Sequence, residues 1–205
     1  MDFTLINKAV NICAKRNSGK SELVKYLVKQ EMNAFDKIFV FSSTEPMNKF
    51  YQKYIPKNNI FSEFSEQWLE RLYKRMTELK DQDKNYNVLI IFDDVNDDLH
   101  ESKMIKKLYS TGRHLNLACI VICQYVNQLP PICRTNCDYM LIGQTNAYSI
   151  ELLSNEYLFG PITKKEFIKM YHDSTKDYNF LIINCNSVKD NNDLNQLYGT
   201  IKAII

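Results

Sequence analysis

One short segment constrains the fold of this 205-residue chain more than any other. Residues 14–21 read Ala-Lys-Arg-Asn-Ser-Gly-Lys-Ser, which matches the phosphate-loop pattern except that Ala14 stands in place of the first glycine. The segment follows an apolar run that ends at Cys13, and it opens a helical pattern that extends from about Gly19 to Met32. A strand, a loop and a helix in this order direct backbone N–H groups and a positive helix dipole at one point. The sequence therefore predicts a phosphate-binding loop.

The side chains of this segment have distinct predicted roles. We expect Asn17, Ser18 and Gly19 to cradle the phosphates of ATP, because glycine permits close approach of the backbone. Lys20 is expected to reach the β- and γ-phosphates, and the Ser21 hydroxyl is a predicted ligand of Mg²⁺. The alternative is a chance Gly-Lys-Ser at a helix start. The strand–loop–helix context disfavours that alternative. The glycine content disfavours it as well, because the chain has only five glycines and one of them is Gly19.

A second polar signature stands at the end of the most apolar run. Residues 88–92 read Val-Leu-Ile-Ile-Phe, which is typical of a strand buried on both faces of a sheet. Asp93, directly after it, is expected to hold the Mg²⁺ that Ser21 also holds. Asp94 is expected to orient or deprotonate the attacking water. The alternative, an aspartate that merely caps a turn, loses weight beside a phosphate loop.

Gln124 follows a third buried strand, residues 118–123. A polar amide at the carboxyl end of a strand beside the phosphate strand can contact the γ-phosphate or its water. The alternative is a strand terminus that simply faces solvent.

The remaining candidates for catalytic residues are arginines. Arg113 and Arg134 are expected in loops near strand ends, and either is a candidate arginine finger that reaches into a neighbouring subunit. We prefer Arg134, because Pro130-Pro131 stiffens the segment that presents it. Arg16 is an alternative that would act within its own chain. Each of these arginines, taken alone, is more often a surface residue.

Apolar runs alternate with helical patterns along the chain, which is typical of a parallel sheet covered on both faces. We expect one α/β P-loop NTPase domain over residues 1–205, with a central, mostly parallel β-sheet flanked by helices on both faces. Ser65 is a predicted helix cap, and Thr163 with Glu166 has capping-box spacing. Asn184–Asp193 is expected to be a loop. Further strands are expected at residues 10–13, 37–41, 139–142 and 180–183, and further helices at about 65–79, 102–111, 147–157 and 163–171.

Composition excludes some classes of function. The net charge is +2, whereas a DNA coat protein would be far more basic. The six cysteines form no Cys-x-x-Cys pair, so buried thiols in a reducing compartment are favoured over a zinc site. The N-terminus lacks the pattern of a secretion signal, and no apolar run reaches membrane-spanning length. We therefore expect an intracellular protein.

The motifs together resemble the poxvirus-type genome-packaging ATPases of large DNA viruses and virophages, a branch of the FtsK–HerA translocases. The resemblance covers residues 10–142. The residues that carry it are Leu89-Ile90-Ile91-Phe92-Asp93-Asp94-Val95, Gly112-Arg113-His114-Leu115-Asn116, Gln124, Leu129-Pro130-Pro131 and Arg134-x-Asn136.

The resemblance implies an ATP-hydrolysing homo-oligomeric ring that threads double-stranded DNA into a capsid through a capsid or portal partner, in the host cytoplasm or the virion. It assigns hydrolysis to Lys20, Ser21, Asp93, Asp94 and Gln124. The alternatives are a small-molecule kinase, which would add an arginine-rich lid, and a regulatory NTPase switch, which would lack Gln124 and a trans arginine.

DNA contacts are expected from one helix. Lys103, Lys106 and Lys107 are spaced to share one helical face. In a ring, this face would be repeated as a positive girdle that follows phosphates without reading bases. The alternative is an ordinary solvated face.

Overall fold

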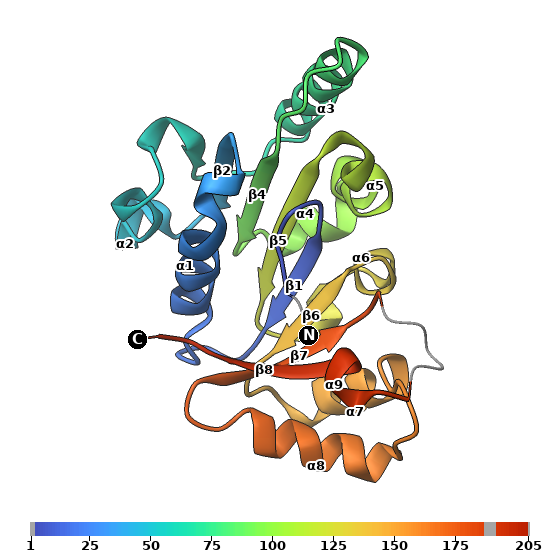
Figure 1. Ribbon diagram of the computed structural model, residues 1–205. Helices are drawn as coiled ribbons and strands as arrows, with labels where there is room; N and C mark the ends of the chain where they lie inside the picture. Colours follow the sequence, from blue (N-terminus) through green and yellow to red (C-terminus); the bar gives the residue numbers. More distant parts are fainter. Residues whose placement is uncertain (1–2, 187–191, 205) are drawn as a thin grey trace.

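A computed structural model describes residues 3–186 and 192–204. Within these ranges the strands form one sheet in the order β3-β2-β4-β5-β1-β6-β7-β8 (Figure 1). Neighbouring strands from β3 to β6 are parallel, and β7 and β8 join one edge in antiparallel pairing. The strands are β1 (Ala9–Cys13), β2 (Lys37–Ser42), β3 (Ile60–Phe61), β4 (Val88–Asp93), β5 (Leu117–Cys123), β6 (Tyr139–Ile142), β7 (Asn179–Asn184) and β8 (Tyr198–Lys202).

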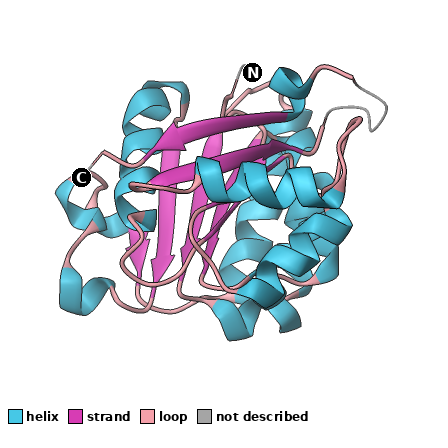
Figure 2. Ribbon diagram, turned by 90° about the horizontal axis from the view of Figure 1, so that it is seen from below, coloured by secondary structure: helices cyan, strands magenta, loops and turns pink. Residues whose placement is uncertain are grey.

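Helices cover both faces of the sheet (Figure 2). One face packs against α1 and the segment 45–55, and the other packs against α3, α5, α6, α7 and α8. The α-helices are α1 (Lys20–Glu31), α2 (Glu45–Asn48), α3 (Glu66–Asp81), α4 (Asn96–Glu101), α5 (Lys103–Thr111), α6 (Pro131–Thr135), α7 (Ala147–Glu156), α8 (Lys164–Ser174) and α9 (Leu194–Leu197). The expected mostly parallel α/β sheet with two helical layers is confirmed.

Local sequence explains where the main elements begin. Every residue of β4 and β5 is buried, as continuous apolar runs in parallel strands require. The Ser65 side chain accepts a hydrogen bond from Trp68 N at the start of α3, and Thr163 and Glu166 form the expected capping box of α8. These hydrogen bonds satisfy N–H groups that have no partner within the helix.

Several short elements were not predicted. They are α2, α4, α6, β3, α9, β8 and the 3₁₀ helices η1 (Met32–Ala34), η2 (Tyr51–Lys53), η3 (Lys57–Asn59), η4 (Gly112–Leu115) and η5 (Val126–Gln128). The loop expected at Asn184–Asp193 begins one residue later than expected, because Asn184 is the last residue of β7. Part of this loop, residues 187–191, lies outside the described residues. Across the described ranges, no helix has the length and apolarity that crossing a membrane needs.

Candidate nucleotide-binding site

The carboxyl ends of β1, β2, β4 and β5 meet at one edge of the sheet, around a cleft of about 530 Å³. Strand β5 lies between β1 and β4, so Gln124 stands between the phosphate loop and the strand-end acids. The cleft brings together most of the predicted site residues. It is lined by Arg16, Asn17, Ser18, Gly19, Lys20, Ser21, Glu22, Ser43, Thr44, Asn48, Asp93, Asp94 and Gln124.

The phosphate loop turns sharply between β1 and α1. Asn17 and Gly19 have positive φ values of 58° and 85°, and such backbone suits asparagine and glycine better than other residues. Lys20 Nζ donates to the carbonyl oxygens of Ala14 at 2.6 Å and Lys15 at 3.0 Å. Burial lowers the pKa of the Lys20 ammonium, and the nearby carboxylates of Asp93 and Asp94 oppose that shift. The loop thus holds its lysine at the floor of the cleft.

Ala14 is fully buried and has a negative φ, so its replacement of the usual glycine causes no backbone strain. The space that the Ala14 methyl group occupies is left open by Gly143. A Cβ at Gly143, which directly follows β6, would lie 2.8 Å from the Ala14 Cβ and 2.8 Å from the Phe180 ring. The methyl group of Ala14 therefore fits because residue 143 has no side chain.

Asp93 is held in place by a residue that the sequence analysis missed. The Tyr51 hydroxyl donates to Asp93 Oδ2 at 2.8 Å, and the buried Glu45 carboxylate fixes this tyrosine by accepting from the Tyr51 backbone N–H at 2.9 Å. Burial raises the pKa of the Asp93 carboxyl to about 6, while the hydrogen bond from Tyr51 opposes this rise and Asp94 adds to it. Asp93 is thus a preoriented carboxylate facing the cleft, 8% exposed.

Asp94 and Gln124 complete the polar wall. Asp94 is exposed and has a φ of 58°, a backbone that aspartate tolerates. The Ser43 hydroxyl donates to Asp94 O at 3.3 Å. Gln128 Oε1 accepts from the backbone N–H groups of Gln124 at 2.8 Å and Tyr125 at 2.9 Å, which fixes the turn that carries Gln124.

Ser43, Thr44 and Asn48 also line the cleft and were not predicted. Ser43 and Thr44 could have been predicted from the sequence, because the polar run Ser42-Ser43-Thr44 directly follows the apolar residues of β2. Parallel strands end at the same edge of a sheet, so the reasoning used for Asp93 also applied here.

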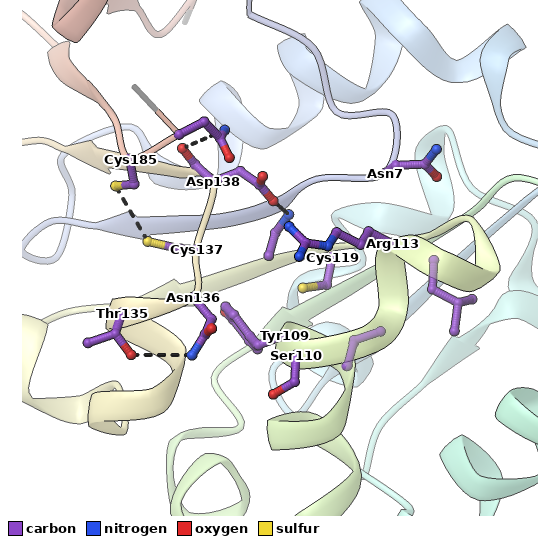
Figure 3. A pocket seen from close by; sticks show the side chains of 14 residues that line it. Asn7, Tyr109, Ser110, Arg113, Cys119, Thr135, Asn136, Cys137, Asp138 and Cys185 are labelled. Carbon is purple, nitrogen blue, oxygen red and sulfur yellow. Dashed lines mark hydrogen bonds between the residues drawn. The ribbon is translucent and has the colours of Figure 1, made fainter. Parts of the chain in front are cut away.

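The structure places Arg113 and Arg134 away from their own chain's cleft. The expectation that both lie in loops is wrong, because Arg113 belongs to η4 and Arg134 to α6. Arg113 lines a cavity of about 170 Å³ together with the first residues of β1 and β5, at the opposite, amino edge of the sheet (Figure 3). Its side chain is exposed and makes no hydrogen bond or ion pair with any residue that the structure describes.

Arg134 is occupied within its own chain. Its guanidinium donates to both carboxylate oxygens of Glu156 at 2.8 Å and to Leu129 O at 2.6 Å. The side chain is only 12% exposed. A role in another subunit would first require this bidentate ion pair to break, so the preference for Arg134 over Arg113 has no support in this arrangement.

The three lysines stand on one side of α5, but their side chains contact different groups. Lys106 Nζ donates to His100 O at 2.6 Å, whereas Lys107 Nζ lies 4.9 Å from the centre of the Tyr73 ring. Lys103 lines a cleft with acidic residues that include Glu66 and Glu70. Each ammonium therefore has a different neighbour.

The cysteines are free thiols, and only Cys185 is not buried. Cys137 and Cys185 contact each other, with their sulfur atoms 3.7 Å apart beside the amino-edge cavity (Figure 3). Within the described ranges, no three His, Cys, Asp or Glu side chains gather as a metal site.

Solved structures with this fold include proteins of viruses. The DNA-packaging ATPase B204 of Sulfolobus Turreted Icosahedral Virus superposes with a TM-score of 0.71 over 98% of this chain and 100% of that chain, at 17% identity. The genome packaging NTPase B204 of Sulfolobus turreted icosahedral virus 2, in complex with ATP-gammaS, superposes with a TM-score of 0.67 over 97% of this chain and 98% of that chain, at 19% identity. At these identities the likeness concerns the fold.

Sequence relatives are also viral. Uncharacterized protein 075L of Invertebrate iridescent virus 6 is 30% identical over 93% of this chain and 75% of its own length. The DNA packaging protein OPG160 of Variola virus is 31% identical over 58% of this chain, and the match spans 46% of that protein. The family described as Poxvirus A32 protein matches residues 4–200. The chain therefore belongs to the poxvirus A32 protein family.

Proposed function

We propose that this chain is an ATP-hydrolysing motor that moves double-stranded DNA and packages a viral genome into a preformed capsid. The observation that carries the proposal is the single cleft in which a phosphate loop, two strand-end acids and a strand-end glutamine meet. The names of the relatives support the same activity, since OPG160 of Variola virus is a DNA packaging protein and B204 is a DNA-packaging ATPase. The site of action would be the infected cell.

Each polar group of the cleft has a task in γ-phosphate transfer to water. The N–H groups at the start of α1 and the Lys20 ammonium would neutralise the β- and γ-phosphates. Asp94, exposed at the end of β4, would orient and deprotonate the attacking water. Gln124, fixed by Gln128 between the loop and the acids, would contact the γ-phosphate or that water.

The residues present fit Mg²⁺. The Ser21 hydroxyl and the Asp93 carboxylate are oxygen donors that line one cleft, and Mg²⁺ prefers oxygen ligands. When bound, the ion would neutralise charge that develops on the phosphate oxygens. Tyr51 would keep Asp93 turned toward the cleft through its hydrogen bond of 2.8 Å.

Assembly into a homo-oligomeric ring would supply what one chain lacks. Among the arginines considered, only Arg16 lines the chain's own cleft. Arg113, which has no side-chain hydrogen bond or ion pair with a described residue, lies at the opposite edge of the sheet, where a neighbour in a head-to-tail ring could receive it as an arginine finger. The ring would also engage a capsid or portal protein.

The proposal is tested by ATP turnover with and without double-stranded DNA, measured beside the mass of the particle in solution. DNA should stimulate turnover, and the stimulation should not depend on sequence. Lys20→Ala should abolish turnover, and Asp94→Asn should retain ATP binding but lose turnover. Lys29→Ala, an exposed lysine in the last turn of the same helix, is the matched control and should behave as the parent. A monomer whose turnover ignores DNA would contradict the motor.

A further inference from the structure

A second cleft adjoins the phosphate loop on the side away from the strand-end acids. Strands β6 and β7 lie on that side of β1, and the cleft between them and the loop has a volume of about 310 Å³. The loop contributes Lys15, Asn17 and Ser18, and the turn between α8 and β7 contributes Asp177 and Tyr178. Asn17 and Ser18 line both clefts, so a ligand that fills one can continue into the other.

The turn opposite the loop has an unusual backbone. Asp177 and Tyr178 have consecutive positive φ values of 50° and 62°, and Asn179 N donates to Lys176 O at 2.9 Å. These are features of a type I′ turn, which favours glycine, asparagine and aspartate at both central positions. A bulky aromatic residue there is strained. Strain of this kind persists where the surrounding structure enforces it, often at ligand sites.

Packing does not explain why a tyrosine occupies this position. Tyr178 as a whole residue is 49% exposed, so its ring contributes little to the core. Its backbone is nevertheless fixed, because Ala203 N donates to Tyr178 O at 3.0 Å and ties the turn to the end of β8. The opposite wall is fixed as well, since Lys15 N donates to Gln144 O at 2.7 Å. An exposed aromatic ring therefore stands on a preorganised turn beside the phosphate loop.

We propose that this cleft receives the nucleoside of the bound nucleotide, with the base stacked on the Tyr178 ring. The inference rests on the proposed function, since it requires that the chain bind a nucleoside triphosphate. An aromatic ring stacks on the flat face of any base. The exposed Asp177 carboxylate accepts hydrogen bonds, and ribose hydroxyls and exocyclic amines of bases are donors within such a cleft. The triphosphate then extends past Asn17 and Ser18 to Lys20.

Calorimetric titration of the full chain with ATPγS and with inorganic tripolyphosphate tests the proposal, because tripolyphosphate lacks the nucleoside. Tyr178→Ala should weaken ATPγS binding about tenfold and leave tripolyphosphate binding unchanged. Tyr178→Phe, which keeps the ring, should bind ATPγS like the parent. Tyr148→Ala is the matched control, since Tyr148 is 63% exposed on α7 and does not line this cleft. The control should bind both ligands like the parent.

Tyr178→Gly separates a binding role from a structural one. Glycine accepts a positive φ without strain, so this variant should have a higher Tm than the parent while its ATPγS affinity falls as in Tyr178→Ala. Equal loss of ATPγS and tripolyphosphate binding, or unchanged ATPγS binding, would overturn the nucleoside site and leave the proposed motor standing. A parent chain that binds neither ligand would overturn both.

Discussion

At the scale of single residues, the buried Asp93 carboxylate lowers the free energy of unfolding when it is ionised, and this effect can be measured. A carboxyl pKa raised from 3.8 to about 6 at Asp93 corresponds to about 3 kcal/mol of unfavourable free energy when the buried group is ionised. Above pH 6 the folded, metal-free protein bears this cost in full. Below about pH 4 the carboxyl is protonated in both the folded and the unfolded chain, so the cost vanishes.

Asp93→Asn removes that charge and keeps an oxygen that can accept from the Tyr51 hydroxyl. We expect the variant, in the presence of a chelator, to be more stable than the parent by about 1–3 kcal/mol at pH 7.5, with the difference shrinking toward zero as the pH falls through 6 to 4. Denaturant titrations across this range measure the difference. A variant less stable than the parent at pH 7.5 would show that the ionised carboxylate is already well compensated.

At the scale of elements, the phosphate loop and β6 are coupled through one methyl group. Gly143→Ala would place its Cβ 2.8 Å from that of Ala14 and from the Phe180 ring, and overpacking of this kind costs about 1–3 kcal/mol. The strain should also reach the loop, because Ala14 O accepts from Lys20. Adding Ala14→Gly should recover part of the loss, since the Phe180 contact remains.

A double-mutant cycle on the free energy of unfolding, beside ATP affinity, measures this coupling. Additive effects of the two substitutions would show that Ala14 and Gly143 relax independently.

We expect the lysines of α5 to have different effects on stability and on DNA binding. Lys106→Glu should lower stability, because it removes the hydrogen bond to His100 O that links α5 to α4. Lys103→Glu combined with Lys107→Glu should leave basal ATP turnover near that of the parent, since neither lysine lines the cleft. If α5 faces DNA in the ring, the double variant should lose stimulation by DNA and show a weaker salt dependence of DNA binding. Stimulation equal to that of the parent would place the DNA contact elsewhere.

The sequence predicted the long elements because their physical signals are strong. Strands β1, β4 and β5 are buried on both faces and therefore appear as continuous apolar runs. The short elements lack such signals. Strand β3 contains two half-buried residues, and β8 has only five residues at the edge of the sheet, of which only Tyr198 is buried.

The candidate site was predictable to the extent that it depends on strand ends. Asp93 ends a buried strand, and Asp94 and Gln124 each directly follow one, so parallel topology brings them together. Tyr51 was not predictable, because its hydrogen bond to Asp93 spans 42 residues and depends on how the segment after β2 folds back. The ion pair of Arg134 with Glu156, 22 residues apart, was hidden for the same reason.

At the scale of the whole molecule, the two candidate arginines can be separated by what each does for one chain. Arg134→Ala should lower stability by about 1–3 kcal/mol, because it leaves the partly buried Glu156 carboxylate without its partner. Glu156→Gln should lower stability in the same direction, and thermal denaturation measures both. Stability unchanged in both variants would free Arg134 for a role between subunits.

Arg113 lies at the amino edge of the sheet and the nucleotide cleft lies at the carboxyl edge, so it can serve only a neighbour's site. Arg113→Ala should assemble but lose turnover, and so should Lys20→Ala. In a random equal mixture, about one quarter of the interfaces of a head-to-tail ring would join an intact arginine to an intact cleft. The mixture should therefore regain turnover that neither variant has alone, measured where native mass spectrometry detects mixed rings. Arg75→Ala, which removes an arginine 60% exposed on α3, should retain turnover by itself. Some interfaces of a mixed ring join an intact Arg113 to a cleft with an intact Lys20. If such rings form and turnover is not regained, Arg113 is excluded as an arginine finger that acts between subunits.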